Sequence, residues 1–99
     1  MINKVLGKIE SVRFGYSEYM FGLNLTLTGN SWGVIASYEY NPSHKDEPIE
    51  LNSLKMLKQV QELLTAAKVD TVDKLKNKPV EATFEGNLLK DFRILTEVL

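Results

Sequence analysis

"FGLNLTLTGNSWGVIASY", residues 21–38, decides the fold, because it holds two strand-like stretches separated by a turn signal. In residues 21–28 the odd positions are apolar and the even ones small or polar, and in residues 32–38 every even position is apolar. A period of two is typical of strands with one buried face. The pair Gly29-Asn30 between them indicates a tight hairpin, and a type II′ turn with Gly29 first fits it.

A two-residue loop at 29–30 predicts how the two strands pair. It places Leu27, Leu25, Leu23 and Phe21 opposite Trp32, Val34, Ala36 and Tyr38, in that order. All the paired apolar residues then lie on one face, whereas a slip of one residue would send half of them to the other. Trp32 is therefore predicted to be a core or core-edge residue that closes the hairpin, with direct binding of a partner as the alternative.

The segments on either side of this hairpin predict one more strand, a loop and a helix. Residues 9–14 are strand-like with a bulge between Ile9 and Val12, and residues 15–18 return the chain into the hairpin. Residues 41–48 are polar and proline-bounded, which is typical of an exposed loop. Residues 53–68 predict an amphipathic helix whose apolar stripe consists of Leu54, Leu57, Val60, Leu64 and Ala67, widened by Met56 and Leu63. Asp70 is placed to cap a second, short helix over residues 71–76.

The last third of the chain predicts a second hairpin. Residues 79–85 form one strand, and residues 88–99 form the other, with Leu88, Phe92, Ile94 and Val98 sharing a side. A three-residue loop, Glu85-Gly86-Asn87, with Asn87 left-handed, pairs Val80 with Phe92 and Phe84 with Leu88. We therefore expect a single α+β domain over residues 1–99. It has an antiparallel sheet of about five strands in β-β-β-α-β-β order and one amphipathic helix packed across one face.

Composition restricts the classes of function. A hydrophobic fraction of 43% and a charged fraction of 25% argue for a globular chain rather than a disordered one. The absence of cysteine excludes disulfides, zinc-thiolate sites and thiol nucleophiles. No apolar run has the length of a membrane span, and residues 1–8 lack the pattern of a signal peptide, so we expect no membrane association and a cytoplasmic location. The net charge of −1 argues against direct nucleic-acid binding and against a DNA mimic.

The sequence holds few groups that carry chemistry. His44 is the one histidine, and although Asp46 and Glu47 lie beside it, a loop with adjacent ligands lacks the convergent spacing of a metal site. No phosphate-binding glycine motif is present. Paired carboxylates brought together from two strands stay open as an acid–base alternative. We expect a protein that is not an enzyme, with no metal and no cofactor.

What remains for function is surface. The sheet face opposite the helix is expected to carry Arg13, Asn24, Thr26, Ile35, Ser37, Glu39, Glu81, Thr83 and Arg93. Tyrosines at strand ends or turns suit recognition, because each has an apolar body and a polar tip. The candidate binding residues are Arg13, Tyr16, Tyr19, Tyr40 and Arg93. The alternative is a plain solvent-exposed sheet face.

Three segments resemble a family of small uncharacterised phage and prophage proteins. They are "SVRFGYSEYMFGLNLTL" (residues 11–27), "SWGV" (residues 31–34) and "VDKLKNKPVEATFEGNLLKDFRILTEVL" (residues 72–99). The segment between Tyr38 and Pro48 fits the family least, since its relatives carry a longer stretch with glycine and tryptophan there. The resemblance implies a small accessory phage gene and brings no catalytic residues.

The phage setting implies two hypotheses about function. The first is a non-enzymatic inhibitor of a host defence system, located in the host cytoplasm. It would be either anti-CRISPR-like, binding a host defence protein, or a sponge that binds a small nucleotide signal. The alternative is a self-assembling or scaffolding accessory protein of phage development. A separate expectation is self-association. Leu89, Leu95 and Leu99 fall on the side of the last strand opposite Phe92 and Ile94, and a second copy would cover them by pairing the leucines or the strand edge across a two-fold axis. The rival is a monomer in which Ile2, Val5 and Leu6 cover that side.

Overall fold

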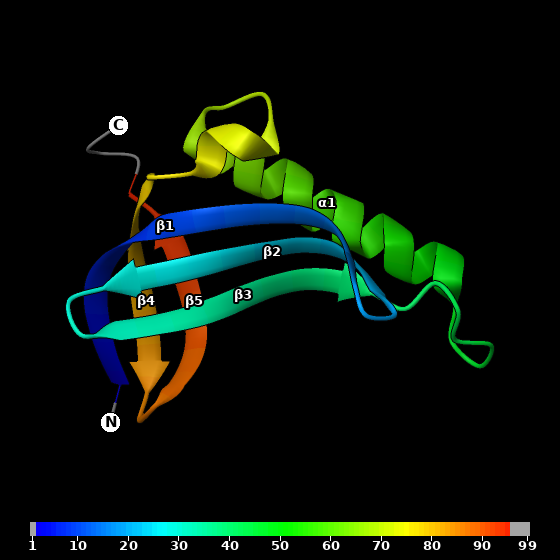
Figure 1. Cartoon of the computed structure of the whole chain (residues 1–99), viewed down its shortest axis with the longest axis horizontal. Helices are drawn as coiled ribbons and strands as arrows, with labels where there is room; N and C mark the ends of the chain where they lie inside the picture. The colour runs from blue at the N-terminus through cyan, green and yellow to red at the C-terminus, as the bar shows by residue number, and fades with distance from the viewer. Residues whose placement is uncertain (1, 96–99) are drawn as a thin grey trace.

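One antiparallel sheet of five strands and one long helix packed against it make up residues 2–95, the part of the chain that the computed structural model describes (Figure 1). The elements are β1 (Ile2–Ser17), β2 (Met20–Gly29), β3 (Trp32–Tyr40), α1 (Ile49–Ala67), the 3-10 helix η1 (Val72–Leu75), β4 (Pro79–Glu85) and β5 (Leu88–Ile94). The expected α+β class and the β-β-β-α-β-β order are confirmed. Across the sheet the strands follow the order β3-β2-β1-β4-β5.

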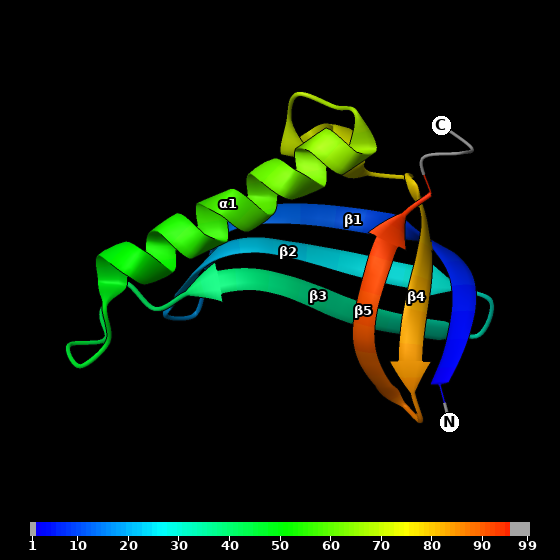
Figure 2. The ribbon, with the colours of Figure 1, turned by 180° about the vertical axis from the view of Figure 1, so that it is seen from behind.

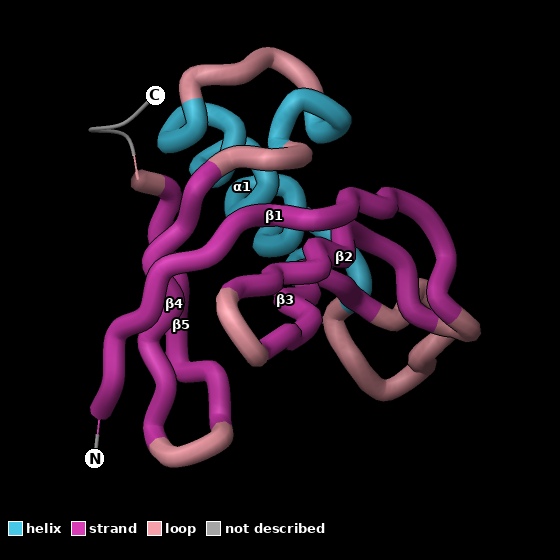
Figure 3. Tube along the Cα trace, turned by 60° about the vertical axis from the view of Figure 1, so that its left-hand side comes forward, coloured by secondary structure: helices cyan, strands magenta, loops and turns pink. Residues whose placement is uncertain are grey.

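The central strand, β1, is long and bent, and its bend gives the sheet its shape. Residues 2–8 pair with β4, and residues 7–17 pair with β2. The register shifts between Ile9 and Ser11, so Glu10 is the extra residue of the bulge that the sequence predicted. Because of the bend, β4 and β5 run across the direction of β2 and β3, and the sheet curls (Figures 2 and 3). The N-terminal residues thus form half of a strand instead of covering one.

The concave face of the sheet carries the core, and α1 lies on that side (Figure 2). Leu23, Leu25 and Leu27 of β2 are fully buried, as are Ile9 of β1 and Val80 of β4. On the opposite, helix-free face the register aligns the polar residues that the alternation predicted, among them Arg13, Asn24 and Ser37 in one row and Glu81 and Arg93 in another. For these rows the face assignment therefore follows from the sequence alone.

The first hairpin keeps the predicted faces but not the predicted register. β2 ends at Gly29 and β3 begins at Trp32, so the loop is Asn30-Ser31, and Leu27 lies opposite Val34. Ser31 takes the left-handed conformation (φ 68°), and Gly29 does not, which rules out the expected type II′ turn. Each residue of β2 therefore pairs with the residue of β3 two positions beyond the predicted one. Because side chains alternate with a period of two, this shift leaves every residue on its predicted face of the sheet.

Trp32 lies at the core edge, as predicted, and two glycines make room for it. Its ring packs edge-on against Phe84 of β4, with ring centroids 5.3 Å apart. A Cβ on Gly29 would overlap the indole Nε1 and Cε2, and a Cβ on Gly7 would lie 2.6 Å from the indole Cζ2. The indole therefore rests on bare backbone, where β1, β2 and β4 meet.

The second hairpin corrects the prediction for the last two strands. The loop is the two-residue Gly86-Asn87, with Gly86 left-handed (φ 62°), and Val80 pairs with Ile94. Phe84 pairs with Leu89 while Thr83 pairs with Asp91, so Lys90 is an extra residue in β5. The bulge keeps Phe92 and Ile94 on the apolar face, as predicted, but Leu89 takes the place predicted for Leu88, which is 63% exposed on the other face.

The same bulge removes the reason given for self-association through the last strand. Leu89 lies on the core side with Phe92 and Ile94 rather than opposite them, and it packs against the core. Leu95 is 8% exposed and donates its backbone N–H to the carbonyl of Pro79. The strand ends at Ile94, and the predicted positions of Val98 and Leu99 lie outside the described residues.

The helix starts one turn earlier than predicted, directly after Pro48, and it is rotated relative to the predicted stripe. Met56, Val60 and Ala67 are its buried residues, with Leu63 and Leu64 partly buried beside them. Leu54 and Leu57, which we assigned to the core, are 55% and 47% exposed, and Leu51 is 62% exposed. The short η1 begins after Thr71, which makes no side-chain cap, and Asp70, predicted to be the cap, pairs with Lys74.

Candidate interaction surface

Four aromatic rings gather on the concave face at the end of the β1–β2 hairpin. Phe21 is the centre of this cluster, with ring centroids 5.4 Å from Phe14, 5.0 Å from Tyr16 and 6.2 Å from Tyr40. All three contacts are edge-to-face, the arrangement that aromatic pairs prefer. We call these four residues, together with Tyr19 in the adjoining turn, the aromatic end.

The strand register explains why these residues meet. Tyr16 of β1 and Tyr40 of β3 are the two cross-strand partners of Phe21, and Phe14 lies one pleat further along β1 on the same face. Residues 18–19 form the turn, with Glu18 left-handed (φ 57°), and they leave Tyr19 pointing outward. A short turn and strict alternation therefore bring together rings that are up to 26 residues apart in the chain.

The aromatic end is only partly covered by the rest of the protein. Phe14 is 44% exposed, Tyr16 59% and Tyr19 62%, although Phe14 and Tyr16 belong to the core-facing side of β1. Large aromatic groups held in place yet open to solvent are typical of the centres of protein interfaces. The arrangement therefore offers a preformed apolar surface with two exposed phenolic hydroxyls.

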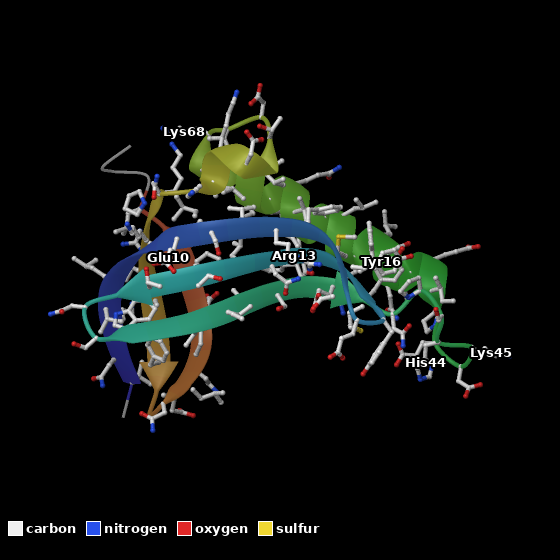
Figure 4. All side chains as sticks on the ribbon, in the orientation of Figure 1. Glu10, Arg13, Tyr16, His44, Lys45 and Lys68 are labelled. Atoms are coloured by element: carbon white, nitrogen blue, oxygen red, sulfur yellow. The ribbon has the colours of Figure 1, made fainter. Side chains whose placement is uncertain are left out.

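The predicted binding residues divide into two groups in space. Arg13 lies on the helix-free face of β1, and its guanidinium donates a hydrogen bond to the backbone carbonyl of Tyr16, which ties it to the aromatic end. Figure 4 shows Arg13 and Tyr16 along β1, with Tyr16 at the same end of the long axis as His44. Arg93 is in β5, where its Nε lies 3.1 Å from Glu81 Oε1 on the helix-free face. Tyr16, Tyr19, Tyr40 and Arg13 thus share one region, and Arg93 does not belong to it.

A pocket of about 400 Å³ adjoins Tyr40, between the end of β3, the loop before α1 and the first half of α1. Its lining is mixed: Met20, Glu39, Tyr40, Asn41, His44, Glu47, Asn52, Lys55, Met56 and Gln59. His44 Nε2 lies 4.0 Å from Glu47 Oε1, and His44 Nδ1 accepts the backbone N–H of Asp46 at 3.3 Å. Glu47 also accepts a hydrogen bond from the amide of Asn52 at 3.3 Å. The polar groups of the loop therefore mainly hold one another.

The chemistry available in this pocket is limited. Its described lining contains no serine, threonine or cysteine that His44 would activate as a nucleophile. Within residues 2–95 no three histidine or carboxylate side chains are grouped as metal ligands. The arrangement can donate and accept hydrogen bonds at the edge of an aromatic surface.

The helix-free face offers a second, more polar surface. Ser37 Oγ donates to Asn24 Oδ1 at 2.6 Å, and Asn24 Nδ2 donates to Glu39 Oε2 at 2.9 Å. Large exposed apolar residues on this face, such as Ile35 and Leu88, are separated by polar rows. These side chains already hydrogen-bond one another, so this face resembles the plain solvent-exposed sheet that we kept as the alternative.

Sequence reasoning missed two parts of this surface. Phe14 was predicted only as part of a strand, and its exposure was not foreseen because nothing in a period of two tells how far a helix reaches along the sheet. The exposure of Leu54 and Leu57 was missed because a helical stripe allows more than one rotation, and Leu51 lay outside the helix predicted over residues 53–68.

Comparison with known proteins adds no relative: no protein-family model, curated protein or solved structure matches the chain. No helix within residues 2–95 has the length and apolar character that crossing a membrane requires.

Proposed function

We propose that this chain is a non-enzymatic binding protein that engages a protein partner through the aromatic end. The observation that carries the proposal is the exposure of Phe14, Tyr16 and Tyr19, at 44%, 59% and 62%. The rings of Phe14 and Tyr16 are also held in place by edge-to-face packing on Phe21. Tyrosine and arginine dominate the energetics of interfaces, because they bury large area with few rotatable bonds or donate several hydrogen bonds. Arg13 supplies the guanidinium at the margin of this surface.

The charges beside the aromatic end favour a protein over a nucleotide as the ligand. The adjoining pocket is lined by two carboxylates, Glu39 and Glu47, and by one lysine, Lys55. Phosphate groups are bound by clustered cations, and the carboxylates of this lining outnumber its lysine. The net charge of −1 argues in the same direction for nucleic acids. A protein surface with mixed hydrogen-bonding groups fits the lining better.

The resemblance to small phage proteins gives this proposal its setting, and it is the sole support for that part. The proposed partner class is a host defence protein in the host cytoplasm, which the chain inhibits by occupying its surface. The test is plating efficiency of a phage on a panel of hosts with and without single defence systems, each with and without this protein. Improved plating on a defence-bearing host alone is the expected result. Equal plating with and without the protein across a broad panel would remove the inhibitor proposal.

A self-assembling accessory protein of phage development is the second candidate. One observation favours it: three leucines on the outer side of α1, Leu51, Leu54 and Leu57, are about half exposed or more. Solvent-exposed leucines on one side of a helix are expected to be covered by another chain. This feature is independent of the aromatic end, so both surfaces can act in one protein.

A further inference from the structure

The outer face of α1 consists of Glu50, Leu51, Leu54, Leu57 and Lys58. In a helix of 3.6 residues per turn, residues three and four positions apart lie on one side, so these five residues form one continuous strip centred on Leu54. The leucines are 62%, 55% and 47% exposed, and both charged residues are exposed. The buried side of the same helix is formed by Met56, Val60 and Ala67. A helix that packs one side on its own sheet thus presents a second apolar strip to solvent.

We propose that α1 pairs with α1 of a second copy, antiparallel, about a two-fold axis at Leu54. The strip reads Glu-Leu-x-x-Leu-x-x-Leu-Lys from residue 50 to residue 58, with an acid at one end, a base at the other and leucines between. About a two-fold axis at Leu54, residue 51 meets residue 57 and residue 50 meets residue 58. Leucine then meets leucine along the whole strip, and Glu50 meets Lys58 at both ends.

The charges select the second copy and the direction of the pair. Neither Glu50 nor Lys58 takes part in an ion pair within residues 2–95, so both are available to a partner. A parallel pair would bring Glu50 next to Glu50 and Lys58 next to Lys58, which repel each other. It would also place the two helix dipoles side by side in the same direction, which is unfavourable. The strip is complementary to a second copy of itself when the two helices run in opposite directions, as an isologous contact requires. Binding to an unrelated partner would not require this self-complementarity.

The position and size of the strip are compatible with such a contact. The N-terminal end of α1 projects past the ends of the strands (Figures 1 and 2), and the strip lies on another side of α1 than its buried residues Met56 and Val60. Three leucines from each copy make an interface smaller than those of stable, specific complexes, in the range of weak contacts. The dimer is therefore weak and forms as the concentration rises.

The mass in solution is the first test. Sedimentation velocity from about 10 μM to about 1 mM should show the mass rising from 11.2 kDa toward twice that value. Leu54→Asp brings two carboxylates together at the axis and should remain at 11.2 kDa throughout. Leu88→Asp, at a leucine 63% exposed but on β5, is the matched control and should behave as the wild type. A wild-type monomer at the highest concentration, or a Leu54→Asp dimer, overturns the proposal.

Charge reversal tests the direction of the pair. Glu50→Lys and Lys58→Glu should each weaken association, by roughly 3- to 30-fold at low salt, and the double variant should restore it. Lys55→Glu makes the same charge change on another side of the helix and should have little effect. Single variants that associate as the wild type, or a double variant as weak as the singles, would overturn the antiparallel register.

Cross-linking tests the axis itself, because the chain has no cysteine. Leu54→Cys should form a disulfide-linked dimer under mild oxidation, and Lys55→Cys should not. Equal cross-linking at the two positions would contradict the axis. Circular dichroism of every variant should show an unchanged fold, since all the substituted side chains on α1 are exposed. The α1 pairing gives the self-assembly candidate a specific contact, and it does not rest on partner binding through the aromatic end. Tyr19→Ala should therefore leave the mass unchanged.

Discussion

Replacing Gly29 by alanine tests how Trp32 is held. The new Cβ would overlap the indole Nε1 and Cε2 and would lie 2.7 Å from the carbonyl oxygen of Leu6. The indole cannot simply tilt away, because Phe84 packs on it with a centroid distance of 5.3 Å and Gly7 approaches it closely as well. Either the ring leaves its position or the β1–β2 backbone shifts.

The size of the effect follows from what the ring buries. A tryptophan that loses all its burial gives up about 4–6 kcal/mol, from about 150–250 Å² at about 25 cal/mol per Å². Trp32 is only partly buried and can keep some contacts after moving, and overpacking typically costs about 1–3 kcal/mol. We therefore expect Gly29→Ala to lower the free energy of unfolding by about 2–3 kcal/mol. Gly33→Ala is the control on the same hairpin, because its Cβ would meet nothing closer than 3.7 Å, and we expect a change within about 0.5 kcal/mol.

Urea unfolding followed by circular dichroism measures both variants, and fluorescence of Trp32, the one tryptophan, reports its surroundings directly. The same Gly29→Ala change made in a Trp32→Ala background should cost less, since only the contact with the Leu6 carbonyl remains. Equal stabilities for Gly29→Ala and Gly33→Ala would refute the packing of the indole against Gly29.

Three further predictions concern the core and its pH dependence. Trp32→Ala should cost about 3 kcal/mol, the lower end for aromatic truncation, and a variant with unchanged melting temperature but lost activity would assign Trp32 to binding instead. In the same denaturation assay, Met56→Ala should lower the free energy of unfolding by about 2–4 kcal/mol, and Leu57→Ala by less than about 1 kcal/mol. A larger loss for Leu57→Ala than for Met56→Ala would contradict the observed rotation of α1. Burial, and secondarily the charge of Asp91, raises the pKa of Tyr38. The neutral phenol thus contributes stability that is fully present below the unfolded pKa of about 10 and is lost as pH rises through the folded pKa. Tyr38→Phe should therefore lose less stability than the wild type as pH rises across that range. Asp91→Asn should lower the pKa of Tyr38 in an absorbance titration.

Much of the fold could be predicted because burial has a period. The alternation in residues 21–38 assigned each side chain to the correct face, although the pairing was wrong by two residues, because the pattern repeats every two and fixes only the parity. The exact loop depends on which residue tolerates a left-handed conformation, and Ser31 took it in place of a glycine. The bulge at Glu10 was visible as a break in the alternation, whereas the one at Lys90 was not, because Leu88 and Leu89 are both apolar.

The candidate site was less accessible from sequence. The tyrosines at strand ends were recognised from their position, and three of them do lie at one end of the molecule with Arg13. That Phe14 joins them depends on where α1 crosses the sheet, which is a tertiary property. Arg93 was grouped with them because all were expected on surfaces near the sheet, but the order β3-β2-β1-β4-β5 carries β5 to the opposite edge from β3.

The most direct test of the account is whether the aromatic end carries the activity. In the plating assay, on a host whose defence the wild type overcomes, the Tyr16→Ala/Tyr19→Ala double variant should lose the plating advantage. Two exposed aromatic anchors at about 2 kcal/mol each correspond to roughly a 1,000-fold loss of affinity. Ile35→Ala, at a residue 66% exposed on the helix-free face, should plate as the wild type. A double variant that folds and keeps its full plating advantage would contradict binding through the aromatic end.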